Sequence, residues 1–388
     1  MGRPARRSRR CLRPRARSDG ELPDDPRSAR GVGSAAVGGD DSPRHAARGA
    51  RQDGGRAVKV RPFTSRGYVI SIIVGLVVWA VVAAVAVGVG GRLWAWGSAV
   101  QVRNVLALRL EWVMTASVVG SGLALAGLAF QALLRNPLAE PYILGVSGGA
   151  GLAFILGSLW VSIAWSPVFG FLGALATVAI VYAISQRRGR LEPYTLLLTG
   201  VIINAFYAAA IMLVTALAKP EQRGDIALWM MGNIGAFGPQ WTLVVVVGAL
   251  AVGVAALFAM LAKGFNLVAV GEDTAGALGV DVGRLRIVTF VAASLVTGAS
   301  VALAGPIGFV GLICPHLLRM VLGPDHRRLV PAALFFGATF LVLADLAACL
   351  WEGATNRALP VGVLTAMCGG PFFIYLLRTR WRRSAQLQ

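Results

Sequence analysis

The chain has 388 residues, of which 56% are hydrophobic and only 14% are charged. Soluble globular domains carry charge on about a quarter of their residues, so this composition excludes an ordinary soluble protein and indicates a membrane protein. The charge is unevenly placed, because residues 1–66 hold 17 of the 37 Lys and Arg and 7 of the 18 Asp and Glu. We therefore divide the chain into a basic tail, 1–66, and a membrane domain, 67–388.

The basic tail is rich in Arg, Gly, Ser, Pro and Asp and has no apolar periodicity, which predicts a disordered segment. An Arg-rich segment can bind nucleic acid or anionic lipid, and it can also be a translated stretch upstream of the true start. The membrane domain behind it argues against a nucleic-acid partner. No apolar run precedes Tyr68, and the run that begins there is long enough to span, so we expect no signal peptide.

Ten apolar segments follow the tail, and they predict an all-α polytopic membrane protein with ten transmembrane helices. A bilayer core about 30 Å thick requires about 20 apolar residues per helix. The seventh and eighth segments are separated by little more than Gly305-Pro306. The predicted spans are roughly Tyr68–Gly90, Met114–Leu134, Ile143–Trp160, Val168–Ile184, Tyr194–Leu217, Trp241–Leu261, Ile287–Leu303, Ile307–Val321, Pro331–Leu350 and Val361–Leu377.

The basic residues between these spans indicate the orientation of the chain. With the N terminus in the cytoplasm, the cytoplasmic segments carry 14 Lys and Arg and the outer segments carry 6, before the tail is counted. This excess predicts that both termini are cytoplasmic, as an even number of spans requires.

Two segments repeat one motif in the second and seventh spans. Gly120–Gly127 (GSGLALAG) and Gly298–Gly305 (GASVALAG) share G-x-x-[LV]-A-L-A-G. The two copies begin five spans apart, so the halves, about 67–217 and 241–377, are predicted to be inverted five-helix repeats, which are typical of transporters. Small residues at this spacing also permit close helix packing, and the two interpretations are compatible.

Residues 145–149 (GVSGG) match G-x-S-x-G, the pattern of a hydrolase's nucleophile elbow. An elbow requires a strand-turn-helix context and His and acid partners, whereas both flanks here are predicted membrane helices. We therefore predict that Ser147 is not catalytic. The alternative is a structural role for this stretch. Asn136 then caps a helix that begins at Pro137, Pro141 begins the next helix, and the glycines from Gly145 onward allow close helix packing.

The chain carries no candidate site for an energy source of its own. A P-loop requires G-x-x-x-x-G-K-[ST], and none of the three lysines is followed by Ser or Thr. A secondary carrier would place ionisable groups inside its spans, and Asp345 is the main candidate, although hydrogen bonding at a helix end suits it better. No cysteine has C-x-x-C spacing, so neither a disulfide framework nor a metal site is expected. If transport is active, a separate subunit supplies the energy.

The longest predicted cytoplasmic loop, Lys263 to Arg286, is suited to meet such a subunit. Acidic residues, small apolar residues and a final Gly predict a short capped helix with an apolar stripe that can dock into another protein. The alternative is a connector that lies on the membrane surface. The candidate docking residues are Glu272, Asp273, Ala275, Ala277, Leu278 and Gly279.

Five long motifs in one order resemble the FecCD-type permeases of ABC importers for cobalamin, iron-siderophores and haem. They are QALLRNPLAEPYILGVSGGAG (131–151), WMMGNIGAF (229–237), VGEDTAGALGV (270–280), VALAGPIGFVGLICPHLLRMVLGPDHRRLVP (301–331) and LPVGVLTAMCGGPFFIYLL (359–377). The resemblance extends from about Arg109 to Leu377 and does not cover the tail.

The resemblance implies ten transmembrane helices, a homodimer in the bacterial inner membrane, and a substrate path between the two copies. It also implies two cytoplasmic ATPase subunits, which bind the ATP and Mg²⁺, and a periplasmic substrate-binding protein. The loop helix matches the family's coupling helix, which enters the ATPase. Residues of the family's structural motifs are Asn136, Pro137, Gly145, Ser147, Gly305, Pro306, Pro315, Asp345 and Pro360.

The chain departs from the family pattern on its outer side. The family often has R-L-P-R before the second span, with both Arg facing the acidic residues of the binding protein, whereas this chain reads RLEW (109–112), so only Arg109 carries over. An outward Arg is also common after the ninth span's Asp, where this chain has Cys349, and Arg357 comes later in a longer loop. The docking surface is therefore expected to be altered.

The predicted function is that of an importer permease for haem or a ferric siderophore, with no cofactor bound by this chain. A cobalamin importer of the same family is the alternative. From other classes, an ion-coupled secondary transporter would rest on Asp345, and an intramembrane hydrolase would rest on Ser147.

Overall fold

A computed structural model describes residues 65–89, 99–162, 165–187, 190–235 and 240–385. Of the basic tail predicted over 1–66, residues 1–64 thus lie outside the described residues. The elements are α1 (Ser65–Val89), α2 (Ala99–Leu133), η2 (Pro141–Leu144), α3 (Val146–Trp160), α4 (Ser166–Ser185), β1 (Gln186–Arg187), β2 (Arg190–Leu191), α5 (Pro193–Leu217), α6 (Pro220–Met230), α7 (Trp241–Val270), α8 (Glu272–Ala277), α9 (Val282–Ala304), α10 (Val310–Leu322), α11 (His326–Thr355) and α12 (Val361–Ala385).

The architecture is helical, as predicted, and the strands β1 and β2 form only a two-residue antiparallel pair. Seven described helices are long and apolar enough to cross a membrane. Three shorter apolar helices, α3, α10 and the first part of α12, lie where the remaining spans were expected. With 15 and 13 residues, α3 and α10 extend only about 20 Å, less than the bilayer core. The count of ten spans and the inverted repeat stay predictions.

Two helices are longer than their predicted spans. α2 begins at Ala99 rather than near Met114, because the segment before the span also consists of good helix formers such as Leu106 and Leu108. α7 continues to Val270 rather than ending near Leu261.

The extension of α7 also corrects the predicted loop from Lys263. Phe265 and Val268 continue the apolar stripe of α7 into the core and are buried, so the helix does not end at Lys263. The connection between α7 and α9 is therefore only residues 271–281, and it contains the short helix α8.

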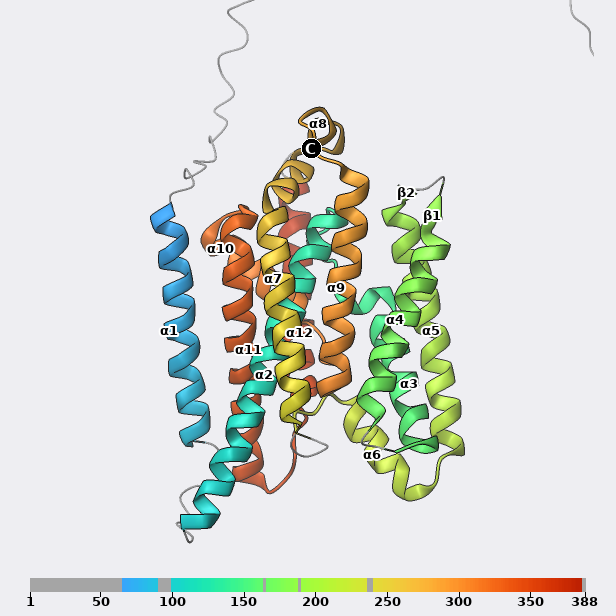
Figure 1. Ribbon diagram of the computed structural model, residues 1–388, viewed down its shortest axis with the longest axis vertical. Helices are drawn as coiled ribbons and strands as arrows, with labels where there is room; N and C mark the ends of the chain where they lie inside the picture. The colour runs from blue at the N-terminus through green and yellow to red at the C-terminus, as the bar shows by residue number, and fades with distance from the viewer. Residues whose placement is uncertain (1–64, 90–98, 163–164, 188–189, 236–239, 386–388) are drawn as a thin grey trace, which may run out of the picture. The chain divides into compact units, whose positions relative to one another are not determined.

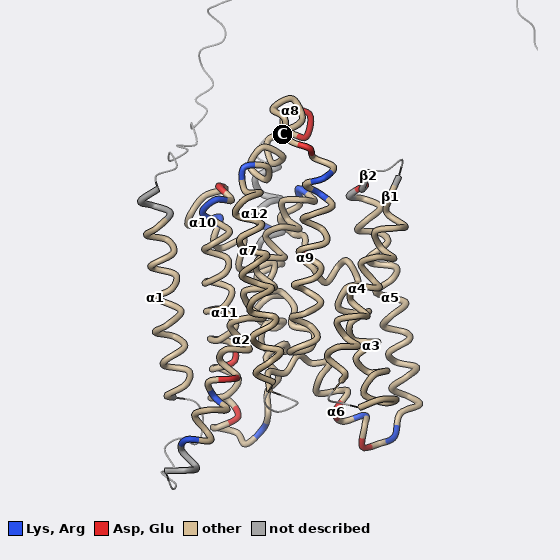
Figure 2. The backbone as a smooth tube through the Cα atoms, viewed as in Figure 1, with Lys and Arg blue, Asp and Glu red and all other residues tan. Residues whose placement is uncertain are grey.

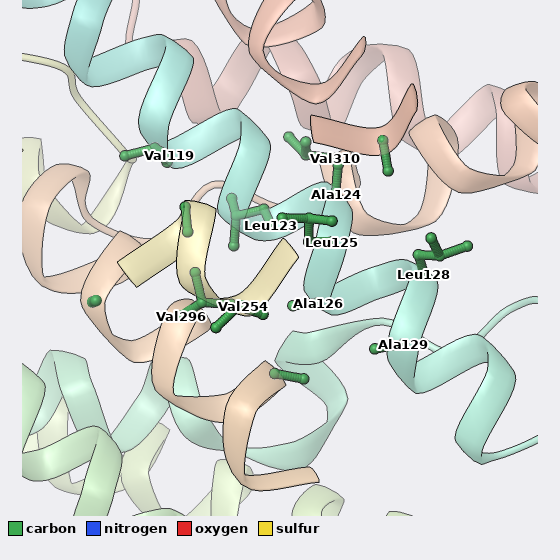
Figure 3. Packing of buried hydrophobic residues seen from close by; sticks show 14 of the residues in the cluster. Val119, Leu123, Ala124, Leu125, Ala126, Leu128, Ala129, Val254, Val296 and Val310 are labelled. Atoms are coloured by element: carbon green, nitrogen blue, oxygen red, sulfur yellow. The ribbon is translucent and has the colours of Figure 1, made fainter. Parts of the chain in front are cut away.

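α2 lies at the centre of the bundle, and α7, α9, α10 and α11 pack around it. Figure 3 shows Leu123, Ala126 and their neighbours in α2 meeting Val254 of α7 and Val296 of α9. α1, by contrast, is mostly exposed and packs mainly against α11. Because burial of small and branched apolar side chains fixes α2, its polar residues have defined surroundings.

The glycines of the repeated motif permit the close contacts that were expected of them. A Cβ atom at Gly127 would lie 1.9 Å from the carbonyl oxygen of Gly311 in α10, and one at Gly120 would lie 2.2 Å from that of Gly337 in α11. In the second copy, a Cβ at Gly298 would lie 2.4 Å from the Cβ of Ala174. At Gly120 and Gly127 the helices approach backbone to backbone, and at Gly298 the backbone of α9 meets a side chain of α4. Glycine allows such close contacts.

The bundle has two ends, which we call the α8 end and the α6 end after the short helices located there (Figure 1). α1 starts at the α8 end, and α2 and α7 run from the α6 end to the α8 end. Lys, Arg, Asp and Glu gather at both ends, and the tube between them is almost free of charge (Figure 2). This distribution fits a bilayer around the middle of the bundle.

Candidate functional site

Four breaks in the helices meet inside the bundle, at a place that we call the junction. It consists of residues 140–144 before α3, 229–232 at the end of α6, 305–309 between α9 and α10, and 360–362 at the start of α12. Glu140 accepts a hydrogen bond from the backbone N–H of Phe309. Motif segments that are far apart in the sequence therefore converge on one structural element.

The side chains of Glu140 and Tyr142 satisfy the backbone of the break between α9 and α10. The Tyr142 hydroxyl accepts a hydrogen bond of 2.8 Å from the N–H of Ile307, and Glu140 accepts from that of Phe309. Non-helical backbone at membrane depth requires such internal partners, since lipid offers none.

Glycines allow the remaining segments of the junction to meet. Gly232 and Gly305 have positive φ angles of 71° and 72°. A Cβ at Gly305 would lie 2.3 Å from the carbonyl oxygen of Trp229, and one at Gly232 would lie 2.5 Å from that of Pro306. The N–H of Gly362, two residues after the buried Pro360, donates to Gly232 at 3.0 Å. The positive φ angles and the short distances to neighbouring carbonyl oxygens both exclude residues other than glycine at positions 232 and 305.

Pro315 gives α10 a second attachment to α2. A proline inside a helix cannot donate to the carbonyl four residues earlier, which here belongs to Gly311. That carbonyl instead accepts a hydrogen bond of 3.1 Å from Nε2 of Gln131 in α2, and the Oε1 of Gln131 accepts one from Arg319. The buried amide of Gln131 is therefore bonded at both of its ends.

α8 is a short capped helix between α7 and α9, as the sequence predicted. Glu272 begins it and pairs with Arg286 of α9. It ends in a Schellman turn, in which Gly279 (φ 83°) donates to Gly276 at 3.0 Å and Val280 donates to Ala275 at 3.0 Å. These contacts hold α8 in a fixed orientation at the tip of the bundle (Figure 1).

The candidate docking residues divide between the two sides of α8. Ala275 has no exposed surface and faces the permease itself, so it holds the helix rather than presenting a contact. Asp273, Ala277 and Gly279 are exposed, and Leu278 is 63% exposed although it is a large apolar residue. Leu278 therefore offers an exposed apolar side chain at the end of α8, on the side that does not face the rest of the bundle.

At the α6 end, Arg109 lies within α2 rather than in a loop before it. Its guanidinium carbon is 5.1 Å from the centre of the Trp112 ring, a cation–π contact. Asp345 of α11 is close enough to Arg109 to interact with it electrostatically. Asp345 lies inside α11 rather than at its end, and the expected hydrogen bonding at a helix end stays a prediction.

Glu111, next to Trp112, has a role that the sequence did not suggest. Its side chain is only 3% exposed, and it accepts a hydrogen bond from the backbone N–H of Gln240, the residue that precedes α7. A carboxylate at the start of a 30-residue helix is stabilised by the helix dipole. Glu111 thus joins the part of α2 at the α6 end to the start of α7.

A cavity of about 150 Å³ lies between α4, α7 and α9. Its lining is apolar throughout and includes Phe171, Leu250 and Leu303. Binding sites for polar ligands place a few convergent polar groups among the apolar ones, and this lining supplies none. We therefore do not place a substrate site there.

Almost all of the membrane domain matches one known family of transport proteins. The model of the FecCD transport family matches residues 67–379. This chain belongs to the FecCD transport family. Its relatives include the cobalamin import permease BtuC of Halobacterium salinarum, 40% identical over 280 residues that cover 70% of this chain and 73% of the relative. It is also 38% identical to the hemin transport permease HmuU of Yersinia pestis, covering 72% of this chain and 84% of the relative.

A third relative is the Fe(3+) dicitrate permease FecD of Escherichia coli, 35% identical with coverage of 69% of this chain and 83% of the relative. Among solved structures, an inward-facing metal-chelate type ABC transporter matches 80% of this chain and 99% of its own, with a TM-score of 0.70 and 28% identity. The FecCD relatives are transport permease subunits, so this chain is a multi-pass ABC permease, and an ion-coupled carrier or a hydrolase is not required to explain it.

In this FecCD protein, Ser147 is the second residue of α3 and follows the 3₁₀-helix η2, not a strand. The adjacent glycines make the contacts: a Cβ at Gly149 would lie 1.8 Å from Thr177 Oγ1. Asn136 does act as a cap, since its Oδ1 accepts from Leu138 at 3.0 Å. It caps a turn, however, and no helix begins at Pro137, because the next helical residues are those of η2. That detail of the prediction is wrong.

Ser147→Ala is expected to leave transport within a few-fold of the wild-type rate, because Ser147 lies in α3 after a 3₁₀-helix and not in the strand-turn-helix of a nucleophile elbow. Ser147→Leu is expected to lower expression and thermal stability, since the larger side chain crowds a half-buried position beside closely packed glycines. Transport in reconstituted vesicles and thermal unfolding of both variants check this. A properly folded alanine variant without transport would contradict it.

Sequence reasoning missed Glu140, Tyr142 and Glu111 as organising residues. The signal for Glu140 was present, because an acid between apolar residues beside predicted spans has to find a partner. Glu111 differs from the family's pattern in sequence, but nothing in the sequence shows that it meets Gln240, which is distant along the chain.

Proposed function

We propose that this chain is the permease of an ATP-driven importer that moves haem or a ferric siderophore from periplasm to cytoplasm, in the bacterial inner membrane. The observation that carries the ATP-driven part is α8, whose inner side is anchored by Ala275 and Glu272 and whose outer side presents Leu278. The α8 end is then cytoplasmic, and both termini lie there.

In this proposal two copies of the chain form a homodimer with the substrate path between them. Two ATPase subunits, which bind ATP and Mg²⁺, contact α8, and a periplasmic substrate-binding protein docks at the α6 end. No P-loop is present in the sequence, so hydrolysis belongs to the partner subunits.

The substrate is proposed as an iron chelate. The names of the relatives include cobalamin, hemin and Fe(3+) dicitrate permeases, so the same architecture serves large metal-containing ligands of several kinds. A large ligand bound mainly by its binding protein needs no metal-ligating cluster in the spans. Cobalamin is the alternative substrate.

Vesicles with the permease, its ATPase and its ligand-loaded binding protein test the proposal. Uptake of haem or a ferric siderophore should require all three components and ATP. Uptake of cobalamin alone would replace the proposed substrate, and uptake driven by an ion gradient without the ATPase would overturn the proposed energy source.

Arg109→Glu is expected to slow association of the binding protein with the reconstituted complex, most clearly at low ionic strength. Charge reversal at the rim of an interface acts mainly on the association rate and its salt dependence. Lys219→Glu, an exposed substitution at the same end, is the matched control. Arg109→Gln with a thermal unfolding assay separates docking from the loss of the Trp112 contact. An unchanged rate and salt slope in the folded Glu variant would limit Arg109 to an internal role.

A further inference from the structure

Asn266, in the last part of α7, joins this helix to the start of α11 through both ends of its amide group. Its Nδ2 donates a hydrogen bond of 2.7 Å to Oδ1 of Asp325, the residue before α11. Its Oδ1 accepts one of 2.9 Å from the backbone N–H of His326, and Nδ1 of the His326 ring lies 2.8 Å from the same oxygen. One side chain of α7 thus contacts two consecutive residues at the beginning of another helix.

These contacts are part of the cap of α11. Oδ1 of Asp325 also accepts from the backbone N–H of Arg327 at 3.0 Å, so the carboxylate that caps α11 is the one that Asn266 binds. The N–H of His326 belongs to the first turn, where a helix provides no partner for it. An amide suits this position because it offers a donor to the carboxylate and an acceptor to the N–H. A residue of α7 therefore completes the start of α11.

An aromatic contact beside this amide holds the same two helices. The ring of Phe265 lies 5.6 Å from that of His326, and the two residues are only 3% and 6% exposed. Two consecutive residues of α7 therefore hold the start of α11. α10 ends at Leu322, and only residues 323–325 separate it from α11. The turn between α10 and α11 is thus attached to α7 at this point.

α8 is attached directly to the part of α7 that carries Asn266. The N–H of Gly271 donates to the carbonyl of Leu267 at 3.2 Å, and the N–H of Ala275 donates to the carbonyl of Gly271 at 2.9 Å. Ala275 is fully buried, which holds α8 against the bundle. A displacement of α8 would therefore act on the turn of α7 that contacts α11.

We propose that Asn266 is a positioning residue of the transport cycle, which connects α8 to the α10–α11 turn and so to α11. From this turn α11 extends toward the α6 end (Figure 1). It thus leads from the side proposed for the ATPase to the side proposed for the binding protein. The inference rests on the proposed contact between α8 and the ATPase, and it does not depend on the substrate.

The test changes the two partners of this hydrogen bond in the complex of permease, ATPase and binding protein, reconstituted in vesicles. Asn266→Asp removes the donor and places a second carboxylate against that of Asp325. ATPase co-purification and basal ATP hydrolysis should be unchanged. Stimulation of hydrolysis by the ligand-loaded binding protein should fall by about five-fold or more, the size of coupling that is typical between two sites. Adding Asp325→Asn restores a donor and an acceptor and keeps a helix cap, so the double variant should recover the stimulation.

Ser121→Ala is the matched control, because it removes another hydrogen bond between α11 and a neighbouring helix. Oγ of Ser121 in α2 donates to the carbonyl of Leu334 at 2.7 Å. The control should lower thermal stability but not the stimulation. The proposal would be overturned by equal losses of stimulation in Ser121→Ala and Asn266→Asp, by normal stimulation in a folded Asn266→Asp complex, or by a double variant that folds but does not recover.

Leu278→Asp distinguishes a failure of this inference from a failure of the proposed function. If Leu278→Asp prevents assembly while Asn266→Asp is stimulated normally, only the role of Asn266 fails. If Leu278→Asp assembles and transports normally, α8 is not the ATPase contact, and the role of Asn266 fails with it. Loss of ATPase co-purification in Asn266→Asp itself would place Asn266 in assembly and would also overturn the inference.

Discussion

Leu278→Asp is expected to leave the permease in the membrane but to prevent it from co-purifying with its ATPase subunits. Leu278 is exposed on the outer side of α8, so the substitution leaves the fold of the free permease unchanged. In the complex the new carboxylate would be buried without a partner, which costs several kcal/mol. Affinity purification of the complex from membranes, followed by measurement of the ATPase-to-permease ratio, checks this.

Leu278→Met is the conservative control and should assemble normally, since it preserves an apolar side chain of similar volume. Thermal unfolding of the isolated permease should be the same for all three proteins. Normal assembly and transport in the Asp variant would remove α8 as the coupling element and would require the ATPase contact to lie elsewhere at the α8 end.

Gly127→Ala is expected to destabilise the protein far more than Gly→Ala at an open helical position such as Gly253. The added Cβ would lie 1.9 Å from the carbonyl oxygen of Gly311 and 2.4 Å from its Cα atom, so α2 and α10 have to separate. Separation also strains the hydrogen bond from Gln131 to the Gly311 carbonyl. We expect a loss of about 3 kcal/mol or more, at or beyond the upper end for overpacked cores.

Gly253→Ala is the control for helix propensity, because nothing lies within 4 Å of a Cβ at that position in α7. It should be neutral or stabilising by about 0.5–1 kcal/mol. Thermal unfolding in detergent and the yield of folded protein distinguish the two variants. If Gly127→Ala unfolds at the wild-type temperature, the close approach of α2 and α10 is not required for stability.

The apolar segments predicted the helices better than they predicted where the helices end. Hydropathy reports which residues lipid or core can surround, and α2 and α7 continue beyond that region. Phe265 and Val268 contact other helices at the α8 end, so they keep α7 helical past Lys263. Those contacts depend on the fold and are not visible in the local sequence.

The candidate sites were predictable to different degrees. The short helix α8 follows from local signals, acids at its start and Gly279 at its end, and these are read directly from the chain. The junction does not, because Glu140 and Phe309 are 169 positions apart and meet only in the folded bundle. Likewise, the relation of Arg109 to Asp345 joins α2 with α11. Features that depend on neighbouring residues could be predicted from the sequence, whereas contacts between distant residues could not.

α7 is one of the helices that connect the two ends of the bundle. Its 30 residues extend about 45 Å, well beyond a bilayer core of about 30 Å. One end leads directly into α8, and at the other the N–H of Gln240 is held by Glu111. Because intrahelical hydrogen bonds keep the rise per residue constant, a push on α8 along this axis is not absorbed inside α7. A displacement of α8 along this axis would therefore reach the contact with Glu111 at the α6 end without passing through the junction.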